Sequence, residues 1–74
     1  MDTLGFNPGD VVFYTLRGKI RINKIIHFVD YEGSEYPLAA LFIEGCNQNY
    51  HIPLNRIYKN REEAREALMK ETVI

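Results

Sequence analysis

The sequence predicts a mainly β fold, in which five short strands form a small barrel or strongly bent antiparallel sheet that ends in one C-terminal α-helix. Three observations carry this prediction. Between residues 10 and 58, short runs of β-branched and aromatic residues alternate with turns that contain Gly, Pro or Asn. The second run is long and changes its alternation midway, which is typical of a strand that bends a sheet. Residues 60–71 carry a capping signal and helical spacing.

The size and composition indicate one domain with a packed core. The chain has 74 residues, of which 46% are hydrophobic. We divide it into a lead-in over residues 1–9, a barrel over 10–58 and a helix over 60–71. Core packing must hold the domain together, because the single cysteine, Cys46, excludes a disulfide within the chain.

The same features bear on location and cofactors. Cys46, His27 and His51 show no metal-ligand spacing, so we expect no metal and no other cofactor. Every apolar run is too short to span a membrane, so no membrane contact is expected. The first residues lack the pattern of a secretory signal. Together with the free cysteine, this indicates the cytoplasm.

The first two strands are expected to form a hairpin. Residues 7–10 (Asn-Pro-Gly-Asp) form a turn, and residues 11–16 are all β-branched, aromatic or leucine, as in a strand. Arg17 and Gly18 make a short reversal. The second strand begins at Lys19.

The second strand is predicted to bend. Its first four residues alternate strictly between charged and apolar, but Ile25 and Ile26 are adjacent and break the alternation. A β-bulge or sharp bend near Asn23 explains this change of parity. The strand is expected to run on to residue 28 or 29.

Three further strands follow at short intervals. Residues 31–35 form a turn, and residues 36–44 form the third strand. A helix is the competing interpretation for this run, but Pro37 and Gly45, which both break helices, leave only seven residues between them. A turn over 45–48 leads to a fourth strand over 49–52. A single 3₁₀ turn over 53–56 and a fifth strand over 57–58 complete the sheet.

The helix carries the clearest local signal. Asn60 is a good N-cap and Glu63 stands at the position of a capping box. The helix is expected from Arg61 to about Glu71, with an apolar stripe from Ala64 to Leu68 docked on the sheet. Residues 72–74 are apolar enough to pack or pair.

The charges are unevenly distributed although the net charge is only −1. Between residues 11 and 29 the charged residues are all basic, and they are Arg17, Lys19, Arg21 and Lys24. The acids follow, at Asp30, Glu32, Glu35 and Glu44. Either paired strands place these charges opposite each other, or a basic hairpin lies beside an acidic one.

The order of elements, with Gly9–Tyr14, then Gly18-Lys19-Ile20, then Ile25, resembles the SH3-like small barrel in its Tudor- and KOW-like versions. The resemblance covers residues 8–58. It implies a binding module, although KOW modules have a second Gly after the Gly-Lys-Ile strand. The chain also has no Trp, which peptide-binding SH3 domains usually use in their groove. The segment 58–68 looks like the end of many small uncharacterised bacterial or phage domains.

The sequence shows no catalytic constellation, so we expect no enzyme. Ser34, the only serine, lies in an acidic turn without a nucleophile-elbow context. Cys46 with His27 or His51 offers a nucleophile and a base in principle, but an incidental turn cysteine is the favoured interpretation. His51 is expected to be half-buried in its strand, and His27 to face outward.

The aromatic residues divide into two groups. Phe13, Phe28 and Phe42 fall within apolar runs, and most should be core. In one interpretation, three tyrosines line a shallow binding groove on one rim of the barrel, next to three bases; these candidate binding residues are Tyr14, Tyr31 and Tyr36 with Arg17, Lys19 and Arg21. The plainer interpretation is that the tyrosines bury their rings and leave the hydroxyls in water.

These residues suggest a non-enzymatic binding module that recognises a protein or peptide through the first hairpin and the nearby tyrosines. Two alternatives stay open. One is a nucleic-acid module that uses the basic cluster from Arg17 to Lys24, disfavoured by the acidic balance of the chain. The other is a structural domain of a homo-oligomer, which buries a sheet edge or residues 72–74.

Overall fold

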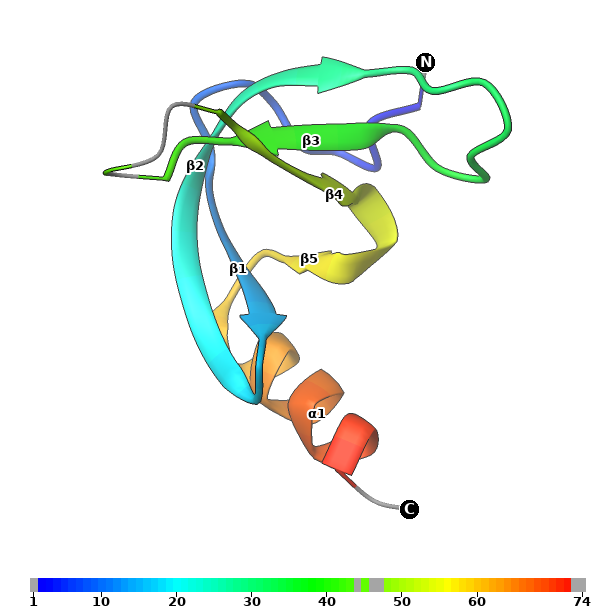
Figure 1. Cartoon of the computed structure of the whole chain (residues 1–74). Helices are drawn as coiled ribbons and strands as arrows, with labels where there is room; N and C mark the ends of the chain where they lie inside the picture. Colours follow the sequence, from blue (N-terminus) through cyan, green and yellow to red (C-terminus); the bar gives the residue numbers. More distant parts are fainter. Residues whose placement is uncertain (1, 44, 46–47, 73–74) are drawn as a thin grey trace.

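A computed structural model describes residues 2–43, 45 and 48–72, and in them the chain forms a curled antiparallel sheet with one helix (Figure 1). The strands are β1 (Val11–Leu16), β2 (Lys19–Val29), β3 (Leu38–Leu41), β4 (Tyr50–Pro53) and β5 (Ile57–Tyr58), with a 3₁₀ turn, η1 (Leu54–Arg56), before β5 and the helix α1 (Arg61–Thr72) after it. The strand order in the sheet is β4-β3-β2-β1-β5. The predicted mainly β fold with a C-terminal helix is confirmed, as a half-barrel.

The β1–β2 hairpin follows its local sequence. Arg17 and Gly18 both have positive φ, of 52° and 75°, which matches the right-handed twist of two paired strands. The hairpin register pairs Phe13 with Ile22 and Tyr14 with Arg21. Glycine adopts this conformation freely, whereas at Arg17 it costs about 1 kcal/mol or more.

β2 belongs to both halves of the sheet and bends between them. Up to Lys24 it pairs with β1, and from Ile25 onward it pairs with β3. The pairing shifts between Ile25 and His27, so Ile26 is the extra residue of a bulge. The predicted position near Asn23 was therefore wrong by three residues. Asn23 keeps the alternation, and the adjacent isoleucines are themselves the irregularity.

The third and fourth strands differ from their predicted bounds. β3 spans only Leu38–Leu41, where Leu38 pairs with Pro53 and Leu41 with Tyr50, and within residues 2–43, 45 and 48–72 no further pair extends it. β4 begins and ends one residue later than predicted, and η1 begins at Leu54 rather than residue 53. β5 is as predicted. The predicted turn over 45–48 includes residues 46 and 47, which lie outside the described residues.

The core lies on the concave face of the sheet. Its strands contribute buried apolar side chains that include Val12, Ile25, Leu41 and Ile52. Phe6 joins them with only 6% of its surface exposed. The predicted lead-in is thus partly core, because the chain before β1 already pairs with β2: the N–H of Gly9 donates to the carbonyl of Ile25 at 2.7 Å, and that of Ile25 to Asp10 at 3.0 Å.

The other phenylalanines are less buried than expected. Phe13 and Phe28 are half-buried, but Phe42 is 56% exposed, so its predicted place in the core was wrong. Leu41 faces the core, and successive side chains of an extended chain point to opposite faces. Phe42 therefore points outward.

The helix is confirmed together with its cap. The Asn60 side-chain oxygen accepts a hydrogen bond from the Glu63 N–H at 2.8 Å. The Glu63 carboxylate reaches back to the N–H of Lys59 at 3.4 Å rather than to that of Asn60. Ala64 is fully buried, and α1 packs on β1, β2 and β5. The predicted packing of residues 72–74 is not tested, because their side chains lie outside the part of the chain that the structure describes.

The cap gives a first prediction. Asn60→Ala should lower the free energy of unfolding by about 1 kcal/mol, because the Glu63 N–H loses its acceptor. Urea denaturation followed by circular dichroism measures the change. Asn55→Ala, at an exposed position in η1, is the matched control and should shift stability by less than about 0.5 kcal/mol. Equal losses in the two variants would contradict the assigned cap.

Candidate functional site

The six residues predicted to line one groove do not converge. β2 has 11 residues and a contour of roughly 35 Å. The Arg17–Gly18 turn precedes it, whereas Tyr31 and Tyr36 lie in the segment that follows it, at the opposite end (Figure 1). The interpretation that they converge on one rim was therefore wrong, because both loops adjoin the same long strand at different ends.

Tyr14 is part of the core and is almost entirely shielded from solvent. It is 2% exposed, and its ring stacks on Tyr50 with centroids 5.8 Å apart. Its hydroxyl lies 2.7 Å from the Asn23 side-chain amide. With this amide oriented to satisfy all of its atoms, Oδ1 accepts from Tyr14, and Nδ2 donates to the carbonyls of Ile22 and Phe42 at 3.0 and 2.8 Å. Tyr14 and Asn23 thus connect β1 and β2 to the chain that leaves β3.

A smaller hollow of about 390 Å³ opens beside this pair. The lining residues are Tyr14, Leu16, Arg21, Ile22, Asn23 and Ile43. Of the predicted site residues, only the cross-strand partners Tyr14 and Arg21 meet here. The other four are not brought to this hollow.

The charges of β2 are separated in space. Lys19, Arg21 and Lys24 pair across the hairpin with Leu16, Tyr14 and Val11, which are uncharged. The acids Asp30, Glu32 and Glu35 are exposed in the segment between β2 and β3. The interpretation that paired strands set these bases opposite these acids was therefore wrong. A basic hairpin end and an acidic loop lie at the two ends of β2; Glu44 is outside the described residues.

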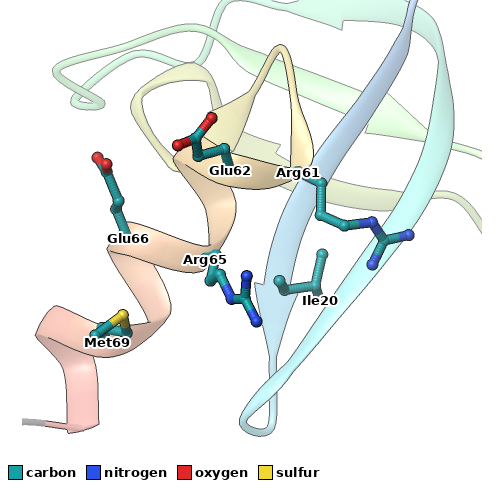
Figure 2. A pocket seen from close by; sticks show the side chains of 6 residues that line it. All are labelled: Ile20, Arg61, Glu62, Arg65, Glu66 and Met69. Atoms are coloured by element: carbon teal, nitrogen blue, oxygen red, sulfur yellow. The ribbon is translucent and has the colours of Figure 1, made fainter.

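A larger groove, of about 580 Å³, lies between α1 and the start of β2 (Figure 2). The lining residues are Ile20, Arg61, Glu62, Arg65, Glu66 and Met69. Ile20 comes from the basic hairpin, and Arg61, Arg65 and Met69 follow one another at i, i+4 and i+8 on the helix. This stripe flanks the docked face of α1, so it lies at the junction between helix and sheet.

The groove has a basic side and an acidic side. The side chains of Arg61 and Arg65 extend toward Ile20, whereas the carboxylates of Glu62 and Glu66 point away from it (Figure 2). The guanidinium carbon of Arg61 lies 5.6 Å from the centroid of the Phe13 ring. This cation–π contact with Phe13 favours one position of the Arg61 side chain, which lowers the cost of ordering it for a ligand.

Sequence reasoning missed this groove, although a signal was present. The stripe Arg61, Arg65 and Met69 could be read from helical spacing once Ala64 and Leu68 were assigned to the docked face. What could not be read was the hairpin residue opposite it. Ile20 faces the helix because Thr15, its partner on β1, lies on the face that α1 covers.

The groups considered for catalysis are placed as follows. The Ser34 hydroxyl donates to the carbonyl of Tyr36 at 2.7 Å within its own loop. His27 is exposed, as predicted, but His51 is exposed as well, so its predicted half-burial was wrong. His51 lies on the outer face of β4, where α1 does not pack. Cys46, the other member of the considered pair, lies outside the described residues.

Two surveys of the described residues add to this picture. No three side chains of the His, Cys, Asp and Glu types gather there in a way that would hold a metal ion. Within the same residues, the structure has no helix of the length and apolar character needed to cross a membrane.

In comparisons with known proteins, the chain matches no protein-family model, no curated protein and no solved structure.

Proposed function

We propose that this domain is a non-enzymatic binding module that holds a short acidic segment of a protein or peptide in the groove between α1 and the β1–β2 hairpin. The observation that carries the proposal is the pair Arg61 and Arg65 directed toward the apolar side chain of Ile20 (Figure 2). Arginine guanidinium groups bind carboxylates with paired hydrogen bonds, and an adjacent apolar surface suits an aliphatic side chain. The SH3-like resemblance of the strands fits such a module.

The charge pattern supports a defined orientation of the ligand. Glu62 and Glu66 form the side of the groove away from the hairpin, where they repel a carboxylate. Arg17 and Lys19 add positive charge at the hairpin end. An acidic residue of the ligand is therefore placed between helix and hairpin, and its apolar neighbour against Ile20 and Met69. We place this activity in the cytoplasm, on the basis of the single cysteine.

The test uses a fluorescent peptide array in which one Leu is flanked by Asp or Glu, with Lys- and Ala-flanked peptides beside it. The wild-type domain should select the acidic peptides. Arg61→Ala with Arg65→Ala should weaken the best peptide at least tenfold by fluorescence polarisation, because each charge-assisted hydrogen bond contributes about 1.5–3 kcal/mol. Arg56→Ala, an exposed arginine of η1, is the matched control and should bind as the wild type does.

The same binding assay, with an oligonucleotide added to the peptides, separates the competing functions. Equal binding of acidic, neutral and basic peptides would contradict the proposal, and so would an unchanged affinity in the double arginine variant. A single-stranded oligonucleotide that binds more tightly than every peptide, with affinity falling steeply as salt rises, would favour the nucleic-acid alternative. For that outcome Arg17, Lys19 and Arg21 would be the residues to vary next.

The homo-oligomer alternative has a separate test. β4 and β5 are the edge strands and have only four and two residues, and short edges resist pairing with another chain. We therefore expect a monomer in sedimentation velocity at both of two protein concentrations that differ about tenfold. A sedimentation coefficient that rises with concentration would show self-association and favour the oligomer.

A further inference from the structure

Both histidines of the chain flank the same residue on the outer face of the sheet. His27 of β2 is the cross-strand partner of Ala40, and Ala40 is in turn the partner of His51 on β4. Directly paired residues of antiparallel strands point to the same face. The two histidines are 24 positions apart in the sequence, so only the strand pairing brings them together.

One residue, Ala40, separates the two histidines across the three paired strands. Neighbouring strands lie about 4.8 Å apart, which puts the Cα atoms of His27 and His51 about 10 Å apart. Both histidines are exposed, whereas Ala40 itself is 0% exposed. Ala40 is not part of the concave core, so side chains on the outer face cover it.

The bulge in β2 is what directs His27 to this face. Ile25 pairs with Leu41 and His27 with Ala40, with Ile26 as the extra residue. Without the extra residue, Ile26 would take the place opposite Ala40, and His27 would oppose Ala39 on the core face. Bulges commonly re-aim side chains next to functional sites. Here the bulge puts His27 on the same face of the sheet as His51.

We propose that His27 and His51 form a two-imidazole site for a divalent transition-metal ion, held above Ala40. Neutral imidazole is a preferred ligand of Zn²⁺, Ni²⁺ and Cu²⁺, and Cu²⁺ binds most tightly in this series. Since no third side chain of a metal-binding type gathers there among the described residues, water completes the coordination. The site is separate from the groove on α1, because α1 packs on β1, β2 and β5 and the histidine pair is centred on β3.

Isothermal titration of the full chain with Cu²⁺, and separately with Ni²⁺ and Zn²⁺, tests the site. The wild type should bind one Cu²⁺ per chain through this pair, and His27→Ala and His51→Ala should each weaken that binding at least tenfold. The double variant, with both histidines changed to Ala, measures the Cu²⁺ binding by the chain terminus and other groups. This background is subtracted from the binding of the wild type. The thermal midpoint of the wild type should rise with Cu²⁺, and that of the double variant should not.

A third variant keeps both histidines and changes only the space between them. Ala40→Leu places a larger side chain under the ion and should weaken Cu²⁺ binding as much as the single histidine variants do. Circular dichroism checks that this variant folds. Ala40→Ser, which changes the side chain least, should keep the wild-type affinity. Single histidine variants that bind as the wild type does would overturn the proposal. One ion per two chains, with a metal-dependent dimer, would also overturn it.

Discussion

Phe6→Ala is expected to lower the free energy of unfolding by about 3–5 kcal/mol, the usual cost of removing a buried aromatic side chain. Phe6 lies before the first strand, yet it is 6% exposed and packs with the core. Stability of about 0.05–0.15 kcal/mol per residue is typical of small proteins, which gives about 4–11 kcal/mol for a 74-residue chain, so this loss is a large share of the margin. Urea denaturation at 25 °C, followed by tyrosine fluorescence, measures it.

The matched control is Phe42→Ala. Phe42 stands in the most apolar run of the sequence but is 56% exposed, so its truncation should cost less than about 1 kcal/mol. The two variants remove the same atoms from opposite environments. A larger loss at Phe42 than at Phe6 would show that the N-terminal segment does not close the core as described.

Ile25→Ala is the second large effect and should cost about 2–5 kcal/mol. Ile25 is 2% exposed on the concave face, where it pairs with Leu41. Its side chain lies at the bend of β2, so the loss leaves a cavity between the two halves of the sheet. Chemical denaturation measures the change in midpoint. If the unfolding free energy falls with denaturant concentration at the same slope as in the wild type, the native fold is retained.

Ile26→Ala tests the same bulge from its other side. Ile26 is 40% exposed, and its truncation should cost clearly less than that of Ile25. The pair is informative because the residues are identical and adjacent, and only the bulge assigns them to different environments. Equal costs would contradict the position of the bulge between Ile25 and His27.

Local signals predicted the elements well. Capping by Asn60, the reversal at Arg17 and Gly18, and strand β1 all depend on neighbours within a few residues, and the structure has them as predicted. The bend in β2 was also expected, but three residues too early. Asn23, opposite buried Val12, keeps the alternation, since its polar side chain is hydrogen-bonded to Tyr14, and the parity changes only at the adjacent isoleucines.

The predicted site fared less well for a different reason. Its residues were grouped by type and by nearness in the sequence, and the length of β2 separates them. Tyr14 went into the core, and Tyr31 and Tyr36 went to the far end of the strand. The bases of the hairpin lie near the start of β2, and the helix adds Arg61 and Arg65 beside Ile20. Ile20 points to the face opposite that of Lys19 and Arg21, because side chains alternate along a strand. Binding by any of these residues stays a prediction.

The sequence by itself determined that this chain is a mainly β domain that ends in a capped helix, because alternation, turn residues and caps act over a few residues. Only the tertiary structure decided which face of each strand is covered, since that depends on pairing between distant segments. It placed Phe6 in the core and Phe42 outside, and it set two arginines against Ile20. It also brought His27 and His51 to either side of Ala40, through one extra residue in β2.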